Sequence, residues 1–401
     1  MNPWLTVIGI GEDGRNGLSP AASAALAQAE LVVGGARHLK LAAPLAAQTH
    51  AWPSPIEGAL ATIEAARGRS VAVLASGDPF FFGVGTMLAR HFGARALRTF
   101  PSPSAFSLAA ARLTWPLQDV QCLSLHGRPI EAVFPHLQPG AKILALSWDA
   151  RTPAALAALL KARGFGGTRV TVLEAMGGAR ERVRTARAEA FALAGVADLN
   201  TLALEVEAGP QAKIIPRAPG LPDAMFEHDG QITKRAIRAV TLSALAPRRG
   251  ELLWDIGAGS GSVGIEWMLA DCANRALAVE RIAQRAARIG RNALGLGVPE
   301  LVVETIAAED FLARAAAAVP DAIFIGGGGP ALFDPAFNAL GQGGRLVANA
   351  VTLQTQAALI EARAKFGGDL TQIAISEAEA IGRFDGWRAA MPVMQWRVVR
   401  Q

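Results

Sequence analysis

The sequence predicts an α/β protein made of two unlike domains that are joined by a proline-rich segment. Its 401 residues exceed what a single core usually holds, so division into domains is expected. In both halves, short apolar runs typical of buried strands alternate with alanine-rich runs typical of helices. Residues 209–222 hold four prolines and show no apolar period, which indicates a linker. We therefore expect domains at residues 1–208 and 223–401.

The composition excludes several classes of protein. The formal net charge is +5 without any basic run, so the clustered basic face of a nucleic-acid-binding protein is not expected. A small polyanionic substrate fits this mild excess. Only Cys122 and Cys272 occur, which permits neither a disulfide framework nor a thiolate metal site, and we expect no metal. The chain shows neither a leader-like start nor an apolar run of membrane-spanning length, so we expect a soluble cytoplasmic protein without membrane contacts.

The first domain begins with an apolar strand over residues 4–11, which ends in Gly9 and Gly11. Ser19 and Pro20 are typical of a helix start and predict a helix over residues 19–28. The remaining elements expected in this domain follow in chain order: strand 31–34, helix 54–66 with Ser54 as its cap and Pro55 in its first turn, strand 71–74, strand 142–147, helix 153–163, strand 169–174 and a final edge strand at 202–206.

The strand at 71–74 leads into Ser76, Gly77 and Asp78. A small residue, a glycine and an acid thus follow the carboxyl end of a strand, where open α/β sheets bind ligands. Three phenylalanines at 80–82 come next, and they are either a wall for a flat ligand or ordinary core aromatics. A proline-stiffened loop then enters a helix near Ser104.

These motifs, together with residues 123–128, resemble the tetrapyrrole methylase family over residues 4–205. Within that family they are most similar to members that methylate carbon 5 of a precorrin ring. The resemblance implies the two-lobed fold of class III methyltransferases, with S-adenosylmethionine (SAM) bound between the lobes. Many relatives have proline where this chain has Glu12. The implied cofactor contacts are Gly9, Gly11, Ser76, Gly77, Asp78, Phe81, Ser104, Ala105, Met176 and Gly177.

A turn at 124–128 carries polar residues that suit a substrate site. His126 lies between Ser124 and Arg128. A single histidine is often a hydrogen-bonded structural side chain, but these neighbours also suit a proton-transfer role. The guanidinium of Arg128 matches a carboxylate in shape. We take Ser124 and Arg128 as candidate substrate contacts and His126 as a candidate catalytic residue.

The second domain is organised around a strand, a glycine-rich turn and a helix at residues 251–266. Asp255 lies in the predicted strand at 252–256, two residues before the first glycine of the turn, and Glu280 ends the next apolar strand. An acid at that position can accept hydrogen bonds from both ribose hydroxyls. An ordinary tight turn and a nicotinamide site are the alternatives. The pattern resembles the Rossmann-like class I SAM methyltransferases, and the candidate cofactor contacts are Asp255, Gly257, Ala258, Gly259, Ser260, Gly261 and Glu280.

Other positions of this domain receive roles from the same resemblance. Thr233 is either the N-cap of a helix over 234–245 or a SAM contact, and Ala307 lies where relatives contact adenine. Gly326 and Gly327 would leave room for a bulky substrate. Residues 281–294 predict a helix with one basic, solvated face to which we assign no function, and the remainder predicts antiparallel closing strands. The remaining candidates are the carboxylate anchors Lys234 and Arg235 and the proton-transfer residues His228 and Asp229.

Residues 220–401 resemble methyltransferases that act at carbon 15 of the ring and decarboxylate the acetate at carbon 12. The combined resemblance implies methylation of precorrin-6Y at carbons 5 and 15 with decarboxylation, giving precorrin-8X on the route to cobalamin. It also implies two SAM sites, no other cofactor and a homo-oligomer. Two alternatives stay open. One is an RNA or protein methyltransferase with an N-terminal binding module, and the other is a nicotinamide-dependent oxidoreductase, because Gly259, Gly261 and Gly264 loosely fit the dinucleotide spacing.

Overall fold

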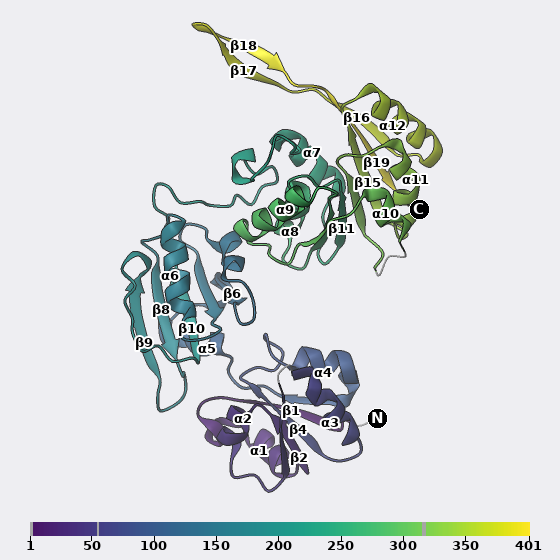
Figure 1. The fold of residues 1–401 in the computed structure, drawn as a ribbon. Coiled ribbons are helices and arrows are strands. Elements are labelled where there is room, and N and C mark those ends of the chain that lie inside the picture. The colour runs from purple at the N-terminus through teal and green to yellow at the C-terminus, as the bar shows by residue number, and fades with distance from the viewer. Residues whose placement is uncertain (1–2, 54–55, 315–317) are drawn as a thin grey trace. The chain divides into compact units, whose positions relative to one another are not determined.

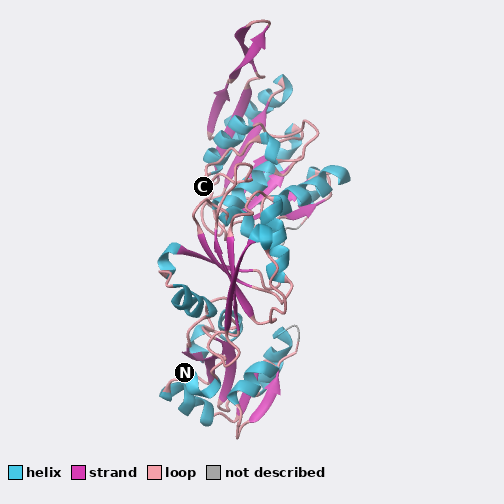
Figure 2. Cartoon of the chain, turned by 90° about the vertical axis from the view of Figure 1, so that its left-hand side faces the viewer, coloured by secondary structure: helices cyan, strands magenta, loops and turns pink. Residues whose placement is uncertain are grey.

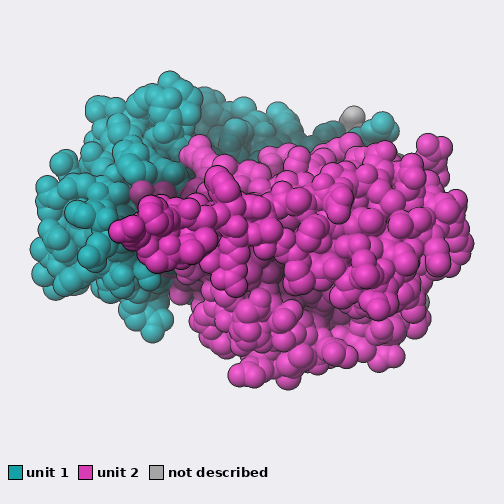
Figure 3. Space-filling view, turned by 90° about the horizontal axis from the view of Figure 1, so that it is seen from above, with its two compact units in different colours: residues 1–130, 136–213 teal, residues 131–135, 214–401 magenta. Residues whose placement is uncertain are grey.

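The computed structural model describes residues 3–53, 56–314 and 318–401. The chain forms two compact units (Figures 1 and 3), one with residues 1–130 and 136–213 and the other with residues 131–135 and 214–401. Residues 209–222 form neither helix nor strand. The finer division into domains 1–208 and 223–401 with a linker between them stays a prediction.

The first lobe of the N-terminal unit is a parallel sheet with helices beside it. Its strand order is β3-β2-β4-β1-β5, and all four neighbouring pairs are parallel. Side chains alternate across β1, because Leu5 and Val7 belong to one buried cluster and Ile8 and Ile10 to another. The elements are β1 (Leu5–Ile10), α1 (Pro20–Ala27), β2 (Leu31–Gly34), α2 (Ala36–Ala42), β3 (Gln48–Ala51), α3 (Ala59–Ala65), β4 (Val71–Ser76), α4 (Gly85–Phe92) and β5 (Leu97–Phe100).

Two predicted helix starts in this lobe have different outcomes. Ser19 caps α1, because its side chain accepts a hydrogen bond from the amide of Ala22 at 3.2 Å. The predicted start at Ser54 and Pro55 lies outside the described residues. The described part of that segment begins with a 3₁₀ turn at Ile56–Gly58, and α3 follows it.

The second lobe is a mixed five-stranded sheet of order β6-β7-β10-β8-β9. The predicted edge strand is wrong, because β10 lies at the centre and pairs antiparallel with both β7 and β8. The edge strands are β6 and β9, and β9 is an arginine-rich, mostly exposed strand that the apolar pattern did not indicate. The elements are α5 (Ala105–Leu113), β6 (Val120–Ser124), β7 (Lys142–Leu146), α6 (Thr152–Ala162), β8 (Arg169–Glu174), β9 (Arg182–Arg187) and β10 (Asn200–Glu205).

The C-terminal unit is built on a seven-stranded sheet of order β13-β12-β11-β14-β15-β19-β16, with helices packed beside it (Figure 2). The first five of these strands are parallel. The predicted antiparallel closing strands are confirmed in β19 and β16. The elements are α7 (Arg235–Leu245), β11 (Leu252–Ile256), α8 (Ser262–Ala270), β12 (Arg275–Val279), α9 (Ala283–Gly295), β13 (Val302–Glu304), α10 (Ala308–Ala313), β14 (Ala322–Ile325), α11 (Phe333–Ala339), β15 (Arg345–Ala350), α12 (Leu353–Phe366), β16 (Asp369–Ile373) and β19 (Val393–Val399).

A separate two-stranded ribbon extends from this unit. Its strands β17 (Ser376–Ile381) and β18 (Phe384–Ala389) pair only with each other, and Figures 1 and 2 show the ribbon projecting beyond the main sheet. The side chains of Ile381, Phe384 and Trp387 are exposed. In the described parts of the chain, no helix is both long enough and apolar enough to cross a bilayer.

Candidate functional site

In the first lobe, three of the predicted motif loops contact one another through their backbones. The amide of Gly77 donates to the carbonyl of Ile10 at 3.2 Å, and the amide of Ser102 donates to the carbonyl of Gly77 at 3.1 Å. The Ser102 hydroxyl donates to the carbonyl of Gly9 at 2.8 Å. A Cβ atom at Gly9 would lie 1.8 Å from the Gly77 oxygen, and Gly77 has φ +54°. Both glycines are therefore required for the loops to meet.

The aromatic residues beside these loops form an exposed wall. The amide of Phe80 donates to the Asp78 carboxylate at 2.9 Å and closes the turn. Phe81 stacks on Phe82 with ring centroids 5.3 Å apart and also contacts Phe106 at 4.8 Å. Phe80, Phe81 and Phe82 are 49%, 40% and 48% exposed. They are not core aromatics, and the exposed apolar surface suits a flat ligand.

Two other predicted cofactor residues of this unit, Ser104 and Met176, make contacts that stabilise the fold. Ser104 is the N-cap of α5 and accepts a hydrogen bond from the amide of Ser107 at 3.1 Å. The Met176 side chain is buried in the cluster around Phe106, so only its backbone is available to a cofactor. The adjacent Gly177 has φ +84°, and Gly11, Ala105 and Gly177 stay predicted contacts.

The predicted substrate turn lies in the second lobe, at the end of β6. His126 and Arg128 are exposed, and Ser124 is half-buried. The His126 ring lies 5.9 Å from the ring of Trp148. The structure therefore places these three residues in a different lobe from Ser76, Gly77 and Asp78, and their roles stay predictions.

A polar cluster that the motifs did not reveal surrounds Ser76. The Arg37 guanidinium forms an ion pair with Glu12 and donates to the Ser76 hydroxyl at 2.8 Å. The Nε2 atom of His38 lies 2.8 Å from the same hydroxyl. Burial, followed by the charge of Arg37, lowers the pKa of His38 to about 4, so this imidazole is neutral near pH 7. The unusual Glu12 was the only sequence signal for this cluster.

In the C-terminal unit, the glycine-rich turn is held by two acceptors from the neighbouring strand. The amides of Gly257 and Ala258 donate to the carbonyl of Val279 at 3.0 and 3.1 Å. The amide of Gly259 donates to the Glu280 carboxylate at 3.0 Å. The Glu280 carboxylate also accepts from the amide of Ile282 at 2.9 Å, so it is fixed beside the turn.

Asp255 is buried directly behind this turn, with 1% of its surface exposed. One carboxylate oxygen accepts from the amide of Gly264 at 2.9 Å. The other oxygen and the buried Ser260 hydroxyl have no hydrogen-bond partner among the described residues. Burial, with a smaller effect from Glu280, raises the pKa of Asp255 to about 7. Unpaired buried polar atoms beside a turn fit a bound ligand that carries donors and positive charge.

The segment before α7 lies against the same turn. The Asn292 side chain donates to the carbonyls of Ser260 and Glu227 at 2.9 and 3.0 Å and accepts from the amide of Glu227 at 2.8 Å. A Cβ atom at Gly259 would lie 3.3 Å from the carbonyl oxygen of Gln231. The structure therefore brings residues 227–231 together with the glycine-rich turn. Sequence reasoning missed Asn292, which carries no motif.

Asp229 is held by two arginines of α9 and is a poor candidate for a proton acceptor. Arg285 and Arg288 lie 2.9 and 3.2 Å from its carboxylate. The hydrogen bond from Arg285, together with the other contacts, keeps its pKa well below the usual range. The prediction of a merely solvated basic face is wrong, because these two arginines pair with the 227–231 segment. The neighbouring His228 accepts from the amide of Gly230 at 3.1 Å.

The start of α7 differs from the prediction. Its N-cap is Lys234, without a side-chain cap bond, so Thr233 is not the N-cap. The Lys234 ammonium lies 3.9 Å from Asp223, and the Arg235 guanidinium donates to the carbonyl of Gly220 at 2.9 Å. Both side chains thus contact residues before the helix, and their roles as substrate anchors stay predictions, as does a cofactor contact by Thr233.

Arg238 is a fully buried arginine that the sequence analysis overlooked. It forms ion pairs with Glu266 of α8 and, at 3.1 Å, with Asp223. It also donates to the carbonyls of Leu221 and Thr233. Its place on the inward face of α7, at helical spacing from Leu242 and Leu245, was the available sequence signal.

The remaining predicted residues lie at other strand ends of the same sheet. Gly326 and Gly327 follow β14 and are exposed, and a Cβ atom at Gly257 would lie 3.0 Å from the Gly327 oxygen. Ala307 is the N-cap of α10, after β13. Within the described ranges, no group of three histidine, cysteine, aspartate or glutamate residues is arranged to hold a metal ion.

Comparison with known proteins assigns both units. The family described as tetrapyrrole (corrin/porphyrin) methylases matches residues 5–192, and the family described as the precorrin methyltransferase domain matches residues 224–400. The two-lobed tetrapyrrole methylase fold followed by a Rossmann-like class I fold is confirmed. The chain is therefore an enzyme of the SAM-dependent methyltransferase class, and the nicotinamide and binding-module alternatives are not supported.

Full-length relatives narrow this class to one family. The precorrin-6Y C(5,15)-methyltransferase (decarboxylating) of Sinorhizobium sp. is 56% identical over 99% of this chain and 96% of its own length. The enzyme of the same name from Mycobacterium tuberculosis (strain CDC 1551 / Oshkosh) is 39% identical over 99% of this chain and 100% of its own. This chain belongs to the precorrin-6Y C(5,15)-methyltransferase (decarboxylating) family.

A solved structure is also similar to the second half of the chain. The C-terminal domain of precorrin-6Y C5,15-methyltransferase from Rhodobacter capsulatus shares 47% identity, covers 46% of this chain and 100% of that chain, and has a TM-score of 0.44.

Proposed function

We propose that this chain methylates precorrin-6Y at carbon 5 with its N-terminal unit and at carbon 15 with its C-terminal unit. The second unit would also decarboxylate the acetate at carbon 12, so that precorrin-8X is formed. Each unit would hold its own SAM molecule. The observation that carries the proposal is family membership over the full chain, combined with two unlike sets of motif loops, one in each unit.

The residues present fit SAM at both places. In the C-terminal unit, the unpaired oxygen of Asp255 and the Ser260 hydroxyl lie behind the glycine-rich turn, and Glu280 is already fixed beside it. In the N-terminal unit, the Gly9–Gly77 contact and the exposed Phe81 ring form the corresponding surface. SAM supplies an electrophilic methyl group. The chain therefore has to bind and orient the cofactor and the substrate, and to exclude water from the site.

A proton must also be moved in each half-reaction, and the structure reorders the candidates. Asp229 is disfavoured by its two arginine partners, whereas His228 and His126 are exposed. His38, which is neutral and 2.8 Å from the Ser76 hydroxyl, is a further candidate in the N-terminal unit. None of these assignments requires a metal.

The experiment is a reaction of the full chain with precorrin-6Y and ¹³C-methyl SAM, read by carbon NMR and by release of carbon dioxide. We expect two labelled methyl carbons and carbon dioxide from the unaltered chain. Asp255→Asn should weaken labelling at carbon 15 and leave carbon 5 labelled. A single labelled position, or equal loss at both positions in this variant, would contradict the assignment of one site to each unit.

We further propose that the chain is a homo-oligomer, and the ribbon β17–β18 supports this. An isolated two-stranded ribbon is marginally stable in water. Its register places Ala378, Ala380, Trp387 and Ala389 on one face, together with Ser376 and Asp385. This face is therefore largely apolar, with small residues beside an exposed indole. Light scattering should give a multiple of 41.7 kDa, and Trp387→Glu should lower that mass. A monomeric unaltered chain would exclude the proposal.

A further inference from the structure

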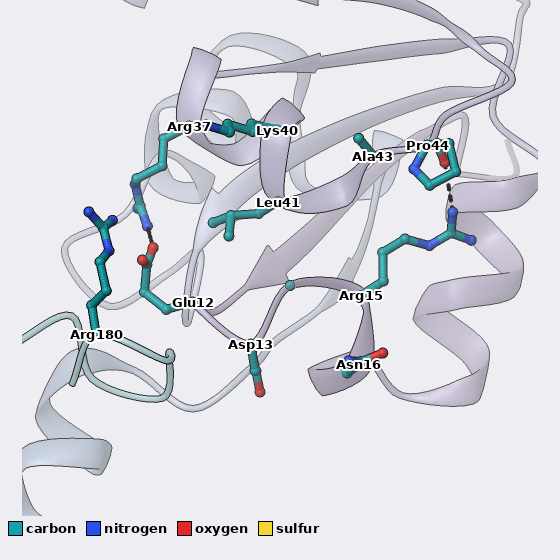
Figure 4. A pocket seen from close by; sticks show the side chains of 11 residues that line it. Glu12, Asp13, Arg15, Asn16, Arg37, Lys40, Leu41, Ala43, Pro44 and Arg180 are labelled. Carbon is teal, nitrogen blue, oxygen red and sulfur yellow. Dashed lines mark hydrogen bonds and ion pairs between the residues drawn. The ribbon is translucent and has the colours of Figure 1, made fainter.

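A pocket of about 630 Å³ lies beside the loop that follows Gly11. Its lining comes from the loop at 12–16, from α2 with residues 43–44 and, after β8, from Arg180 (Figure 4). Among its lining residues, Glu12 was the one that the sequence pattern singled out. It lies entirely within the N-terminal unit.

The lining carries more positive than negative side chains. The lining includes four cations and two acids, namely Arg15, Arg37, Lys40 and Arg180 with Glu12 and Asp13. Glu12 forms an ion pair with Arg37, and the Arg15 guanidinium donates to the carbonyl of Pro44 at 2.7 Å. The side chains of Lys40 and Arg180 make no hydrogen bond or ion pair to any residue that the structure describes. Two cations of the pocket thus lack a counter-charge.

The position of Arg180 is set by the backbone of its turn. A Cβ atom at Gly178 would lie 2.8 Å from the Cβ of Glu12, so the turn packs directly on the loop that carries Glu12. Figure 4 shows the Arg180 side chain beside the Glu12–Arg37 pair. Glu12 forms an ion pair with Arg37 but none with Arg180, so the two guanidinium groups carry more positive charge than this one carboxylate offsets, and a further anion beside them would be stabilised. A carboxylate is the anion whose planar shape matches a guanidinium.

The pocket is connected to the motif loops of the same unit. Arg37, which lines it, also donates to the Ser76 hydroxyl at 2.8 Å, and Ser76 directly precedes Gly77 in the loop that packs on Gly9. The Arg37 side chain would therefore contact both the bound carboxylate and the predicted cofactor loop.

We propose that this pocket binds a carboxylate arm of the ring substrate through Arg37, Lys40 and Arg180, and so orients the ring for methylation at carbon 5. This inference rests on the proposed function. SAM also carries a carboxylate, so the test must separate the two sources. Binding of the substrate arm predicts an effect on substrate affinity, whereas binding of the cofactor arm predicts an effect on SAM affinity.

The test compares the full-length variants Lys40→Gln and Arg180→Gln with Arg95→Gln, a change at an exposed arginine outside the pocket. We expect each pocket variant to raise the KM for precorrin-6Y in carbon 5 methylation about tenfold, which is typical for loss of one charged hydrogen bond. The kcat and the calorimetric Kd for SAM should stay within about twofold. The KM of the unaltered chain should also rise with salt, and less steeply after Arg180→Gln.

The inference is overturned if both pocket variants keep the KM of Arg95→Gln, or if the Kd for SAM rises while the KM for precorrin-6Y does not. Failure of the proposed function gives a different result, because the unaltered chain would then transfer no label to carbon 5 of precorrin-6Y. Circular dichroism of each variant verifies that the chain is folded, and the retained SAM affinity provides a second, independent control.

Discussion

The two candidate cofactor sites of this chain are held together by different forces. In the N-terminal unit, the loops meet through backbone atoms, and a Cβ at Gly9 would lie 1.8 Å from the Gly77 oxygen. In the C-terminal unit, the buried acids Asp255 and Glu280 accept amide hydrogen bonds of the turn and of the helix behind it. Two loops that bind one kind of ligand can thus depend on steric fit in one fold and on hydrogen bonds to buried carboxyl groups in another.

The largest expected effect concerns the buried charges around the C-terminal site. Arg238→Met would leave Glu266, which is 5% exposed, without its cation. Removing one partner of a buried pair costs about 3–5 kcal/mol, so we expect the free energy of unfolding of this unit to fall by that amount in urea titrations. The matched control is Arg249→Met, because Arg249 is exposed and lies 3.8 Å from Asp271. Equal losses of unfolding free energy in both variants would contradict the expected difference between a buried and an exposed arginine.

The second prediction concerns pH. The folded chain keeps a proton on Asp255 up to about pH 7, whereas an unfolded aspartate loses it near pH 4. Between these values the folded state binds more protons, so this carboxyl lowers the free energy of unfolding as pH rises, by up to about 4 kcal/mol. Asp255→Asn should remove that part of the pH dependence. If the free energy of unfolding changes with pH equally in the unaltered chain and in Asp255→Asn between pH 4 and 7, Asp255 does not titrate in this way.

The third prediction tests the steric character of the N-terminal site. Gly9→Ala forces a methyl group against the Gly77 carbonyl, and overpacking of this kind costs about 1–3 kcal/mol. We expect carbon 5 methylation to be lost while carbon 15 methylation continues. Gly290→Ala is the control, because a Cβ there meets no atom within 4 Å. The steric account is wrong if Gly9→Ala retains carbon 5 methylation and stability.

The smallest expected effect concerns Ser104. Its hydroxyl caps α5, and removal of an N-cap typically costs about 1 kcal/mol. Ser104→Ala should therefore lower thermal stability slightly and leave the Kd for SAM almost unchanged. If the Kd rises tenfold or more with little change in stability, Ser104 binds the cofactor directly, as the sequence predicts.

Much of the candidate C-terminal site followed from local pattern. Asp255, the three glycines and Glu280 lie on one strand–turn–helix unit and the next strand, so their sequence spacing determines that they meet. Arg238, Asn292 and the pair Arg285–Asp229 could not be predicted in this way. The contacts Arg238–Glu266, Asn292–Glu227 and Arg285–Asp229 join residues that lie 28, 65 and 56 positions apart along the chain, and no periodicity encodes such contacts.

The N-terminal unit shows the same limit. The motif at Ser76–Asp78 was visible because a glycine and an acid follow a strand, but the pocket at Arg37 and Arg180 was not. These two residues come from different lobes and carry no motif, and they are brought together by the packing of Gly178 on Glu12, which pairs with Arg37. The central place of β10 in its sheet could likewise not be predicted. An apolar strand can lie at the centre of a sheet or at an edge that other elements cover, and its composition is the same in both places.

The sequence alone determined the class of fold, the two unlike halves and the loops that carry the glycines, because these depend on local spacing and strand–turn–helix geometry. Tertiary structure alone decided which charges are buried together, which strand is central and where unpaired cations gather. Those outcomes depend on contacts between segments that lie far apart in the chain. Such contacts stabilise the fold only once the whole unit has packed.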